Sequence, residues 1–331
     1  MPKVSVVMPA YNAETYIGEA IGSILRQTFR DFELIVINDA SADATERIIL
    51  SFQDDRIVYV RNEKNMGVAR TLNRGLSMAK GEYIARMDAD DISLPERFRK
   101  QTAFLDENPQ IAVVGAAIEM FGDGEKPERR CFSQSSEAMK VDLFFSCGLA
   151  HPSVMMRKSV IAELGGYDPA FEGLEDYQLW CRVAREHGIT TLPDLLFRYR
   201  VHGGQVTKNP STEHRRRFQA LKAWQLEQLG LPEKGALADC YYDLCQGKYP
   251  DTKEKILTLA AFFESALEAN RTGCQYEPAL LERAFRGILL SAAAELNHAD
   301  AEAVCAGTPL VDRNRLRRGR FRRTLRRLLR R

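Results

Sequence analysis

Strand-like and helix-like segments alternate through the first two hundred residues of this 331-residue chain. Short apolar runs predict strands at residues 4–8, 33–37, 57–60, 82–87 and 112–118, with helices between them, the first at about 14–27. Parallel strands need such crossover helices, because each strand must return over a face of the sheet before its neighbour begins. The alternation therefore predicts an α/β fold with a mostly parallel sheet flanked by helices.

The strand signals stop beyond about Gly204. Segments rich in Ala, Leu, Glu and Arg follow, separated by turn signals at Gly230, 248–251 and Gly273. With 45% hydrophobic residues, the chain can bury one sizeable core and a smaller satellite. We therefore predict three parts, listed by residue number: an α/β domain at 1–208, a helical C-terminal region at 209–312 and a basic tail at 313–331.

The cysteines and the N-terminus favour a cytoplasmic protein. Seven cysteines, an odd number, are scattered without a CxxC pair or a zinc-ligand rhythm, which indicates a reducing compartment. The chain runs from Met1 directly into a strand pattern too short for the apolar region of a signal sequence. No apolar run is long enough to predict a membrane span.

The tail at 313–331 carries eleven arginines and no acids, while the whole chain has a net charge of only +2. Phe321, Leu325, Leu328 and Leu329 share one arc of a helical wheel, as in helices that lie on membranes. We expect peripheral binding to the anionic inner face of the cytoplasmic membrane. A solvated tail and a tail that binds nucleic acid or a protein are the alternatives.

Three carboxylates follow the predicted strand at 82–87: Asp88, Asp90 and Asp91. Parallel sheets present ligand-binding groups at the carboxyl ends of their strands. Acids this close repel one another, and a cation would offset the repulsion. Hard oxygen ligands suit Mg²⁺ or Mn²⁺ better than zinc. The alternative is a solvated acidic turn that caps the next helix, near Pro95.

Asp39 follows the predicted strand at 33–37, so it should lie on the same rim of the sheet as Asp88. A carboxylate there could accept hydrogen bonds from the imide N–H of uracil or from ribose hydroxyls. The alternative is a turn residue. For Asp43, four residues further on, we predict only a charge at a helix N-terminus.

Glu175 and Asp176 open another predicted helix, whose apolar positions Leu179, Val183 and Trp180 should face inward. Favourable interaction with the helix dipole, about 0.3–1 kcal/mol each, would explain acids in a first turn. A helix start can also aim a carboxylate into a cleft, where a base could deprotonate a hydroxyl. The sequence leaves both explanations open.

Five short motifs occur in a characteristic order. They are Pro9-Ala10-Tyr11-Asn12, Asn38-Asp39-Ala40-Ser41, Asn65-Met66-Gly67, Asp88-Ala89-Asp90-Asp91 and Glu175-Asp176-Tyr177. In order and spacing, this set resembles family 2 glycosyltransferases of the GT-A fold, over about residues 3–205. The resemblance implies an inverting enzyme that moves a sugar from a nucleotide-sugar donor, usually a UDP-sugar, to an acceptor hydroxyl.

The resemblance also implies roles for individual residues. Donor binding falls to Pro9, Ala10, Tyr11, Asn12, Asp39, Asn65, Gly67 and Asp88. Asp90 would ligate the Mn²⁺ or Mg²⁺ ion that bridges the diphosphate, and His202 would complete its shell. Asp176 would be the general base, with Glu175 supporting it or touching the acceptor.

Some positions have an alternative explanation or depart from the family pattern. His202 has the alternative of a surface histidine, and His151, which also fits the pattern, is expected to be structural or on the acceptor side. Gln178 replaces a common aspartate and keeps hydrogen bonding without the charge. Leu72 stands where an arginine is often found, so a donor contact from that arginine is not expected.

The sequence contains no Gln-x-x-Arg-Trp motif, which is typical of processive synthases. We therefore expect single additions to a saccharide or lipid-linked acceptor in polysaccharide or glycolipid synthesis, with no nucleic-acid partner. One alternative is a catalytically inactive scaffold that binds nucleotide-sugars. Another is a sugar nucleotidyltransferase, which should carry a glycine-rich triphosphate loop near residue 10 and does not.

Overall fold

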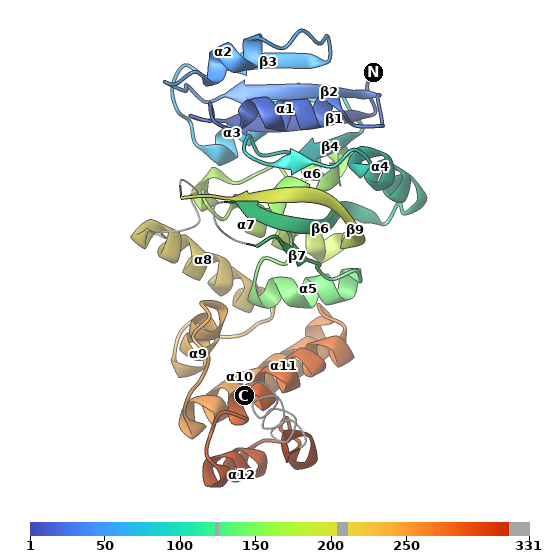
Figure 1. The fold of residues 1–331 in the computed structure, drawn as a ribbon. Helices are drawn as coiled ribbons and strands as arrows, with labels where there is room; N and C mark the ends of the chain where they lie inside the picture. The colour runs from blue at the N-terminus through green and yellow to red at the C-terminus, as the bar shows by residue number, and fades with distance from the viewer. Residues whose placement is uncertain (123–125, 204–210, 318–331) are drawn as a thin grey trace. The chain divides into compact units, whose positions relative to one another are not determined.

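The computed structural model describes residues 1–122, 126–203 and 211–317, and the chain forms two compact units (Figure 1). The first unit comprises Met1–Leu143 and Cys147–Arg217, and the second comprises Phe144–Ser146 and Phe218–Arg331. The division after Arg217 lies close to the predicted boundary at 208, but the three-part domain scheme stays a prediction.

The N-terminal half of the sheet in the first unit is parallel. Its strands are β1 (Val4–Ala10), β2 (Phe32–Asn38), β3 (Ile57–Arg61) and β4 (Tyr83–Arg86), in the spatial order β3-β2-β1-β4. All three pairings among them are parallel, so their carboxyl ends meet at one edge. These four elements match the predicted strands, and the α/β fold class is confirmed.

The sheet continues past β4 as β8-β6-β9-β5, with β7 paired to β6. The strands are β5 (Ile92–Ser93), β6 (Ile111–Gly122), β7 (Glu128–Arg130), β8 (Met155–Arg157) and β9 (Gly188–Val201). β6 and β9 are parallel, while the β4–β8, β6–β8, β6–β7 and β5–β9 pairs are antiparallel. A mostly parallel sheet therefore describes the N-terminal half, and the C-terminal half is mixed.

Helices connect the strands and cover the sheet (Figure 1). Their bounds are α1 (Ile17–Leu25), α2 (Thr45–Leu50), α3 (Val68–Met78), α4 (Arg97–Glu107), α5 (Ser136–Phe145), α6 (Lys158–Glu163) and α7 (Glu175–Glu186), with short 3-10 turns η1 (His151–Ser153) and η2 (Pro169–Phe171). Gly75 lets α3 approach the sheet, because a Cβ there would lie 2.4 Å from Val7 Cγ1. Leu179, Val183 and Trp180 of α7 are fully buried, as predicted.

The described residues of the second unit form helices joined by loops, with no strand among them. It contains most of α8 (Thr212–Gln228), then α9 (Ala236–Cys245), α10 (Lys253–Gly273), α11 (Pro278–Ala293) and α12 (His298–Gly307). The rings of Phe263 and Phe285 stack in its core with centroids 4.0 Å apart. Side chains of Thr252, Glu277 and Asn297 cap α10, α11 and α12 at their N-termini. The predicted helical C-terminal region is therefore present.

Within the described ranges, no helix has both the length and the apolar character that a membrane crossing requires. Residues 313–317 of the basic tail are described, and its predicted amphipathic face at 321–329 lies outside the described residues.

Candidate active site

The loops after β1 and β2 are bound to each other at the carboxyl edge of the sheet. The backbone N–H of Asn12 donates to Ser41 Oγ at 3.0 Å, and the N–H of Ala42 donates to Asn12 Oδ1 at 3.0 Å. Asn12 and Ala40 both adopt the left-handed region, with φ of 46° and 59°. That conformation is costly for alanine and concentrates at functional sites. The first two motifs therefore form one rim at the carboxyl edge of the sheet, with a defined backbone conformation. Tyr11, in the first motif, is 53% exposed.

Asp39 anchors the loop that precedes α3. Its Oδ1 accepts hydrogen bonds from Asn62 Nδ2 at 2.6 Å and from the N–H of Met66 at 2.9 Å, and its Oδ2 accepts from the N–H of Gly67 at 3.1 Å. Asn65 Oδ1 also accepts from Gly67. Asp39 is thus more than a local turn residue, and it keeps acceptor capacity on Oδ2.

Glu172 clamps the same loop from a distant part of the chain. Its carboxylate accepts from the N–H groups of Val68 and Ala69, at 2.5 and 3.1 Å, which are the first residues of α3. Gly67 must be glycine here, because its φ is 84° and a Cβ would lie 2.7 Å from Glu172 Oε1. Sequence reasoning missed Glu172, since no local pattern indicates a contact across more than one hundred residues.

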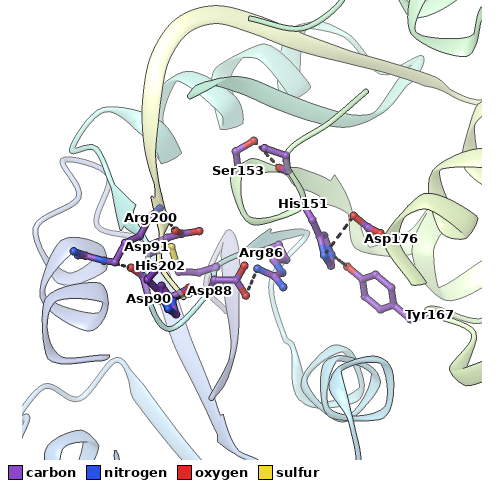
Figure 2. Close-up of polar contacts among 12 residues, drawn as sticks. Arg86, Asp88, Asp90, Asp91, His151, Ser153, Tyr167, Asp176, Arg200 and His202 are labelled. Carbon is purple, nitrogen blue, oxygen red and sulfur yellow. Dashed lines mark hydrogen bonds and ion pairs between the residues drawn. The ribbon is translucent and has the colours of Figure 1, made fainter. Parts of the chain in front are cut away.

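The acids after β4 form one cluster (Figure 2). Ligand atoms of Asp88, Asp90 and Asp91 all lie within 4.8 Å of one another. Burial raises the pKa of Asp90 and raises that of Asp91 still more, and the Asp88 charge adds to both. His202 Nε2 lies 2.9 Å from Asp90 Oδ2 and lowers the pKa of Asp90 in part. The acidic triplet and the histidine predicted from distant motifs are thus adjacent.

Two arginines hold this cluster, and neither was predicted as a site residue. Arg86, the last residue of β4, is buried and forms an ion pair with Asp88. The N–H of Arg200 donates to Asp91 Oδ1 at 2.7 Å, and its Nε donates to the backbone carbonyl of Asp90 at 2.7 Å. In the sequence, the only indication of a role for Arg86 was its position next to the acidic triplet. Arg200 had been placed beside His202 by strand alternation alone.

The cluster has the donor set of a divalent cation site. Three carboxylates and an imidazole suit Mg²⁺ or Mn²⁺. Asp91 Oδ2 is buried and has no hydrogen-bond partner in the described part of the chain, so its charge is not offset by a donor there. A cation would provide a partner for this oxygen and offset the mutual repulsion, which adds to the effect of burial on the pKa values of Asp90 and Asp91.

Glu175 and Asp176 begin α7, but they are not simple surface acids at a helix start. Burial, with the nearby Asp176, raises the pKa of Glu175 from 4.5 to about 7. Burial also raises the pKa of Asp176, although the N–H of Tyr177 donates to its Oδ1 at 2.7 Å. The Asp176 side chain stays 23% exposed, so a substrate can reach it. A carboxylate with a raised pKa and access to solvent is suited to accept a proton.

His151 lies between the acidic cluster and α7 (Figure 2). Its Nε2 lies 2.8 Å from the Tyr167 hydroxyl, and its Nδ1 lies 4.0 Å from Asp176 Oδ2. Burial and the charge of Arg86 lower the pKa of His151 well below its usual value, so the ring is neutral. Tyr167 was missed from the sequence, and the Gly165-Gly166 pair before it, with both φ values positive, was the available signal.

The remaining residues that were predicted to bind the nucleotide-sugar lie along the same rim. Pro9 and Ala10 end β1 and pair with β2 at Ile37 and Asn38, which places them beside the Asp39 loop. Asp43 instead caps the region before α2, where its carboxylate accepts from the N–H groups of Glu14 and Thr45. That agrees with the prediction of a charge at a helix start.

Comparison with known proteins gives matches of two kinds. Residues 5–165 match the profile of the family described as Glycosyl transferase family 2. An uncharacterized glycosyltransferase of Haemophilus influenzae is 32% identical over 254 residues, which cover 70% of this chain and 77% of that protein. A UDP-Glc:alpha-D-GlcNAc-diphosphoundecaprenol beta-1,3-glucosyltransferase of Escherichia coli is 29% identical over 66% of this chain and 85% of its own length.

Among solved structures, the fold resembles S. aureus TarS, crystallised with UDP-GlcNAc. The TM-score is 0.59 at 19% identity, with 92% of each chain covered. This likeness shows that the fold extends over nearly the whole chain. The profile match and the coverage of the H. influenzae relative identify the sequence family, and the predicted α/β architecture agrees with it. The chain belongs to glycosyltransferase family 2 and is a glycosyltransferase.

Proposed function

We propose that the protein is an inverting, metal-dependent glycosyltransferase that adds single sugars from a nucleotide-sugar donor, a UDP-sugar in the first instance. The observation that carries this proposal is the cluster of Asp88, Asp90 and Asp91 with His202, on the sheet edge that also bears the Asp39 loop. Nucleotide diphosphates are anionic, and an acidic cluster with a cation can bind them. The UDP-sugars named for the E. coli relative and for TarS support the choice of nucleotide.

For the donor, we assign the nucleoside to the rim formed by the loops after β1 and β2. Tyr11 offers an exposed ring to the base, next to Pro9, Ala10 and Asn12. Asp39 has acceptor capacity left on Oδ2 for an imide N–H, and its other bonds hold the loop of Asn65 and Gly67 in place. In this assignment the buried carboxylate of Asp39 both holds the loop of the nucleoside site and accepts a hydrogen bond from the base.

For the diphosphate, we assign Asp90 and His202 as metal ligands, with Asp88 shared between metal and ribose. When bound, the ion would act as a Lewis acid that offsets charge on the departing diphosphate. Arg86 would hold the Asp88 side chain in place through their ion pair. Arg200 would hold the backbone of Asp90 toward His202.

Asp176 is the proposed general base. It would take the proton of the acceptor hydroxyl while that oxygen bonds to the anomeric carbon and the carbon–phosphate-oxygen bond breaks. One base on the face opposite the leaving group is sufficient for inversion. Glu175, which is about half protonated at a pH near its pKa of about 7, would support Asp176 or contact the acceptor.

The acceptor is proposed to be a saccharide, free or lipid-linked, in cell-surface polysaccharide or glycolipid synthesis at the inner face of the cytoplasmic membrane. The lipid-linked substrate named for the E. coli relative supports this class. The arginines of 313–331 would add about 1 kcal/mol each when well placed near anionic lipid. Deletion of 313–331 should preserve turnover on a soluble acceptor and reduce flotation with anionic vesicles. Unchanged flotation would remove the membrane role.

The first test is a thermal-shift panel of UDP, GDP and dTDP and their sugars, each with Mn²⁺, Mg²⁺ or EDTA. A ligand that binds the folded protein raises its melting temperature. We expect a metal-dependent shift with one nucleotide family, lost in Asp90→Ala and kept in the control Asp55→Ala, which changes an exposed acid elsewhere. A shift that EDTA does not reduce would contradict metal-dependent binding.

The second test concerns the base. Asp176→Asn should lose about 100-fold or more in turnover, as expected when a general base is removed. Its nucleotide shift should match that of the wild type, because Asp176 is placed on the acceptor side. Full turnover by this variant would exclude Asp176 as the base, and loss of the nucleotide shift would contradict its placement.

A further inference from the structure

Two buried polar side chains, Tyr167 and His151, lead to the proposed base Asp176. Tyr167 Oη lies 2.8 Å from His151 Nε2, and His151 Nδ1 lies 4.0 Å from Asp176 Oδ2 (Figure 2). The ring of Trp180 meets the His151 ring nearly at right angles, with centroids 5.9 Å apart. The imidazole is therefore held on one side by the α7 core and on the other by a tyrosine hydroxyl.

Tyr167 is itself fixed at both backbone groups. Its N–H donates to Asn73 Oδ1 at 2.9 Å, and its carbonyl accepts from Asn73 Nδ2 at 2.7 Å. The side chain is 1% exposed. Burial raises the pKa of the Tyr167 hydroxyl, so that it stays protonated. A neutral, immobile phenol thus faces Nε2.

The protonation of the histidine ring follows from its two neighbours. A neutral imidazole has one N–H, and its position is set by what each nitrogen faces. A carboxylate can only accept, so a proton on Nδ1 points a donor at Asp176, whereas the other tautomer points a lone pair at it. With the proton on Nδ1, Nε2 accepts from Tyr167, and both contacts are favourable.

Asp176 needs such an orienting group. Its Oδ1 accepts from the N–H of Tyr177, while Oδ2 is approached by the thiol of Cys147 at 3.9 Å and by His151. Neither contact on Oδ2 is a close hydrogen bond, and catalytic contacts are often long before substrate is bound. The charged and titratable groups that act on this carboxylate are Arg86 of β4, Asp88, Cys147, His151 of η1, Tyr167 and Glu175 of α7.

We propose that Tyr167 and His151 are positioning residues for the base: Tyr167 fixes the proton of His151 on Nδ1, and that N–H orients Asp176 toward the acceptor hydroxyl. The proposal rests on the proposed function, in which Asp176 is the base. It assigns a role to a histidine that the sequence placed no more closely than structural or acceptor-side.

The test compares His151→Asn with His151→Gln. An asparagine amide can place a donor near the position of Nδ1, and a glutamine amide near that of Nε2, while both remove the ring and its packing. We expect His151→Asn to keep turnover within about threefold of wild type, and His151→Gln and Tyr167→Phe to lose about tenfold or more. The acidic limb of kcat against pH should rise by about one pH unit in the impaired variants, because the carboxylate loses a donor.

Nucleotide binding and a control variant distinguish a positioning role from a folding defect. All three variants should keep the metal-dependent nucleotide shift of the wild type, and His187→Asn, at the other end of α7, should match wild type in every measurement. Equal turnover in His151→Asn and His151→Gln, or a loss in His151→Gln without movement of the acidic limb, would overturn the proposal. If Asp176→Asn keeps full turnover, both the assignment of Asp176 as the base and the positioning role of Tyr167 and His151 are refuted. If Asp176→Asn is inactive while His151→Asn and His151→Gln have equal turnover, Asp176 remains the proposed base and only the positioning role is refuted.

Discussion

Replacing Glu175 with glutamine should stabilise the protein above neutral pH and have little effect near pH 4. Glu175 is 7% exposed, and its pKa is raised from 4.5 to about 7. Since a tenfold change in proton binding corresponds to about 1.4 kcal/mol, a rise of this size corresponds to a cost of about 3 kcal/mol for the ionised side chain in the folded state. Glutamine avoids this cost and can still accept the hydrogen bond from the N–H of Gly173.

The direction of the pH dependence follows from proton linkage. Below pH 4.5 the carboxyl is protonated in the folded and the unfolded chain, so it contributes no difference. Between 4.5 and about 7 the unfolded chain releases the proton while the folded chain keeps it, and the free energy of unfolding falls as the pH rises. The advantage of Glu175→Gln should therefore grow from near zero at about pH 4 to about 3 kcal/mol at about pH 8.

Urea denaturation without donor or metal can measure this difference. The chain has two tryptophans, so a Trp224→Phe background leaves Trp180, buried in α7 within the first unit, as the fluorescent reporter. Glu186→Gln, an exposed position on the same helix, is the matched control and should show no such pH-dependent gain. An equal advantage of Glu175→Gln at both pH values would refute the assignment of the cost to a buried, ionised Glu175.

Two further predictions concern the loop before α3. Glu172→Ala removes the acceptor for the first N–H groups of α3 and should cost about 1–2 kcal/mol of stability, as helix-capping losses do, and weaken the nucleotide shift. Urea unfolding against Glu163→Ala, an exposed acid, measures the stability loss, and equal values would contradict the clamp. Asp39→Asn places an amide N–H₂ where three donors converge and should lower the melting temperature without ligand. An unchanged melting temperature would show that the Asp39 contacts are not stabilising.

The sequence predicted the parts of the fold that depend on local pattern. The strands at 4–8, 33–37 and 57–60 correspond to β1, β2 and β3, because each is a short apolar run bounded by turns. The short strand β8 and the antiparallel pairs of the C-terminal half were not predicted. Their identity as strands depends on partners far away in the chain, as in the pairing of Ile92 with Arg198.

The candidate site likewise contains residues that local motifs identify and residues that only the folded structure reveals. Asp88 and Asp176 were identified because short motifs carry them. The structure brings their neighbourhoods together through Arg86, which forms an ion pair with Asp88 and whose charge offsets part of the rise that burial causes in the pKa of Asp176. Glu172 and Tyr167 had no motif of their own in the sequence analysis. Each acts across long stretches of chain, on α3 and on His151, so only the folded geometry shows its function.

The charge of the site indicates the order in which ligands bind. Asp88, Asp90 and Asp91 lie together, Arg86 forms an ion pair with Asp88, and the guanidinium of Arg200 pairs with Glu19 and donates to the backbone carbonyl of Asp90. Without a cation, this cluster would repel the diphosphate of a nucleotide at short range, where such repulsion is strongest. Under the proposed function, we therefore expect the metal to bind before the donor or together with it, rather than after it. Metal affinity should in turn rise when a nucleotide diphosphate is present, because binding linkage is reciprocal. Mn²⁺ titrations with and without UDP would show this coupling, and identical Mn²⁺ affinities would mean that the cluster and the diphosphate do not share an ion.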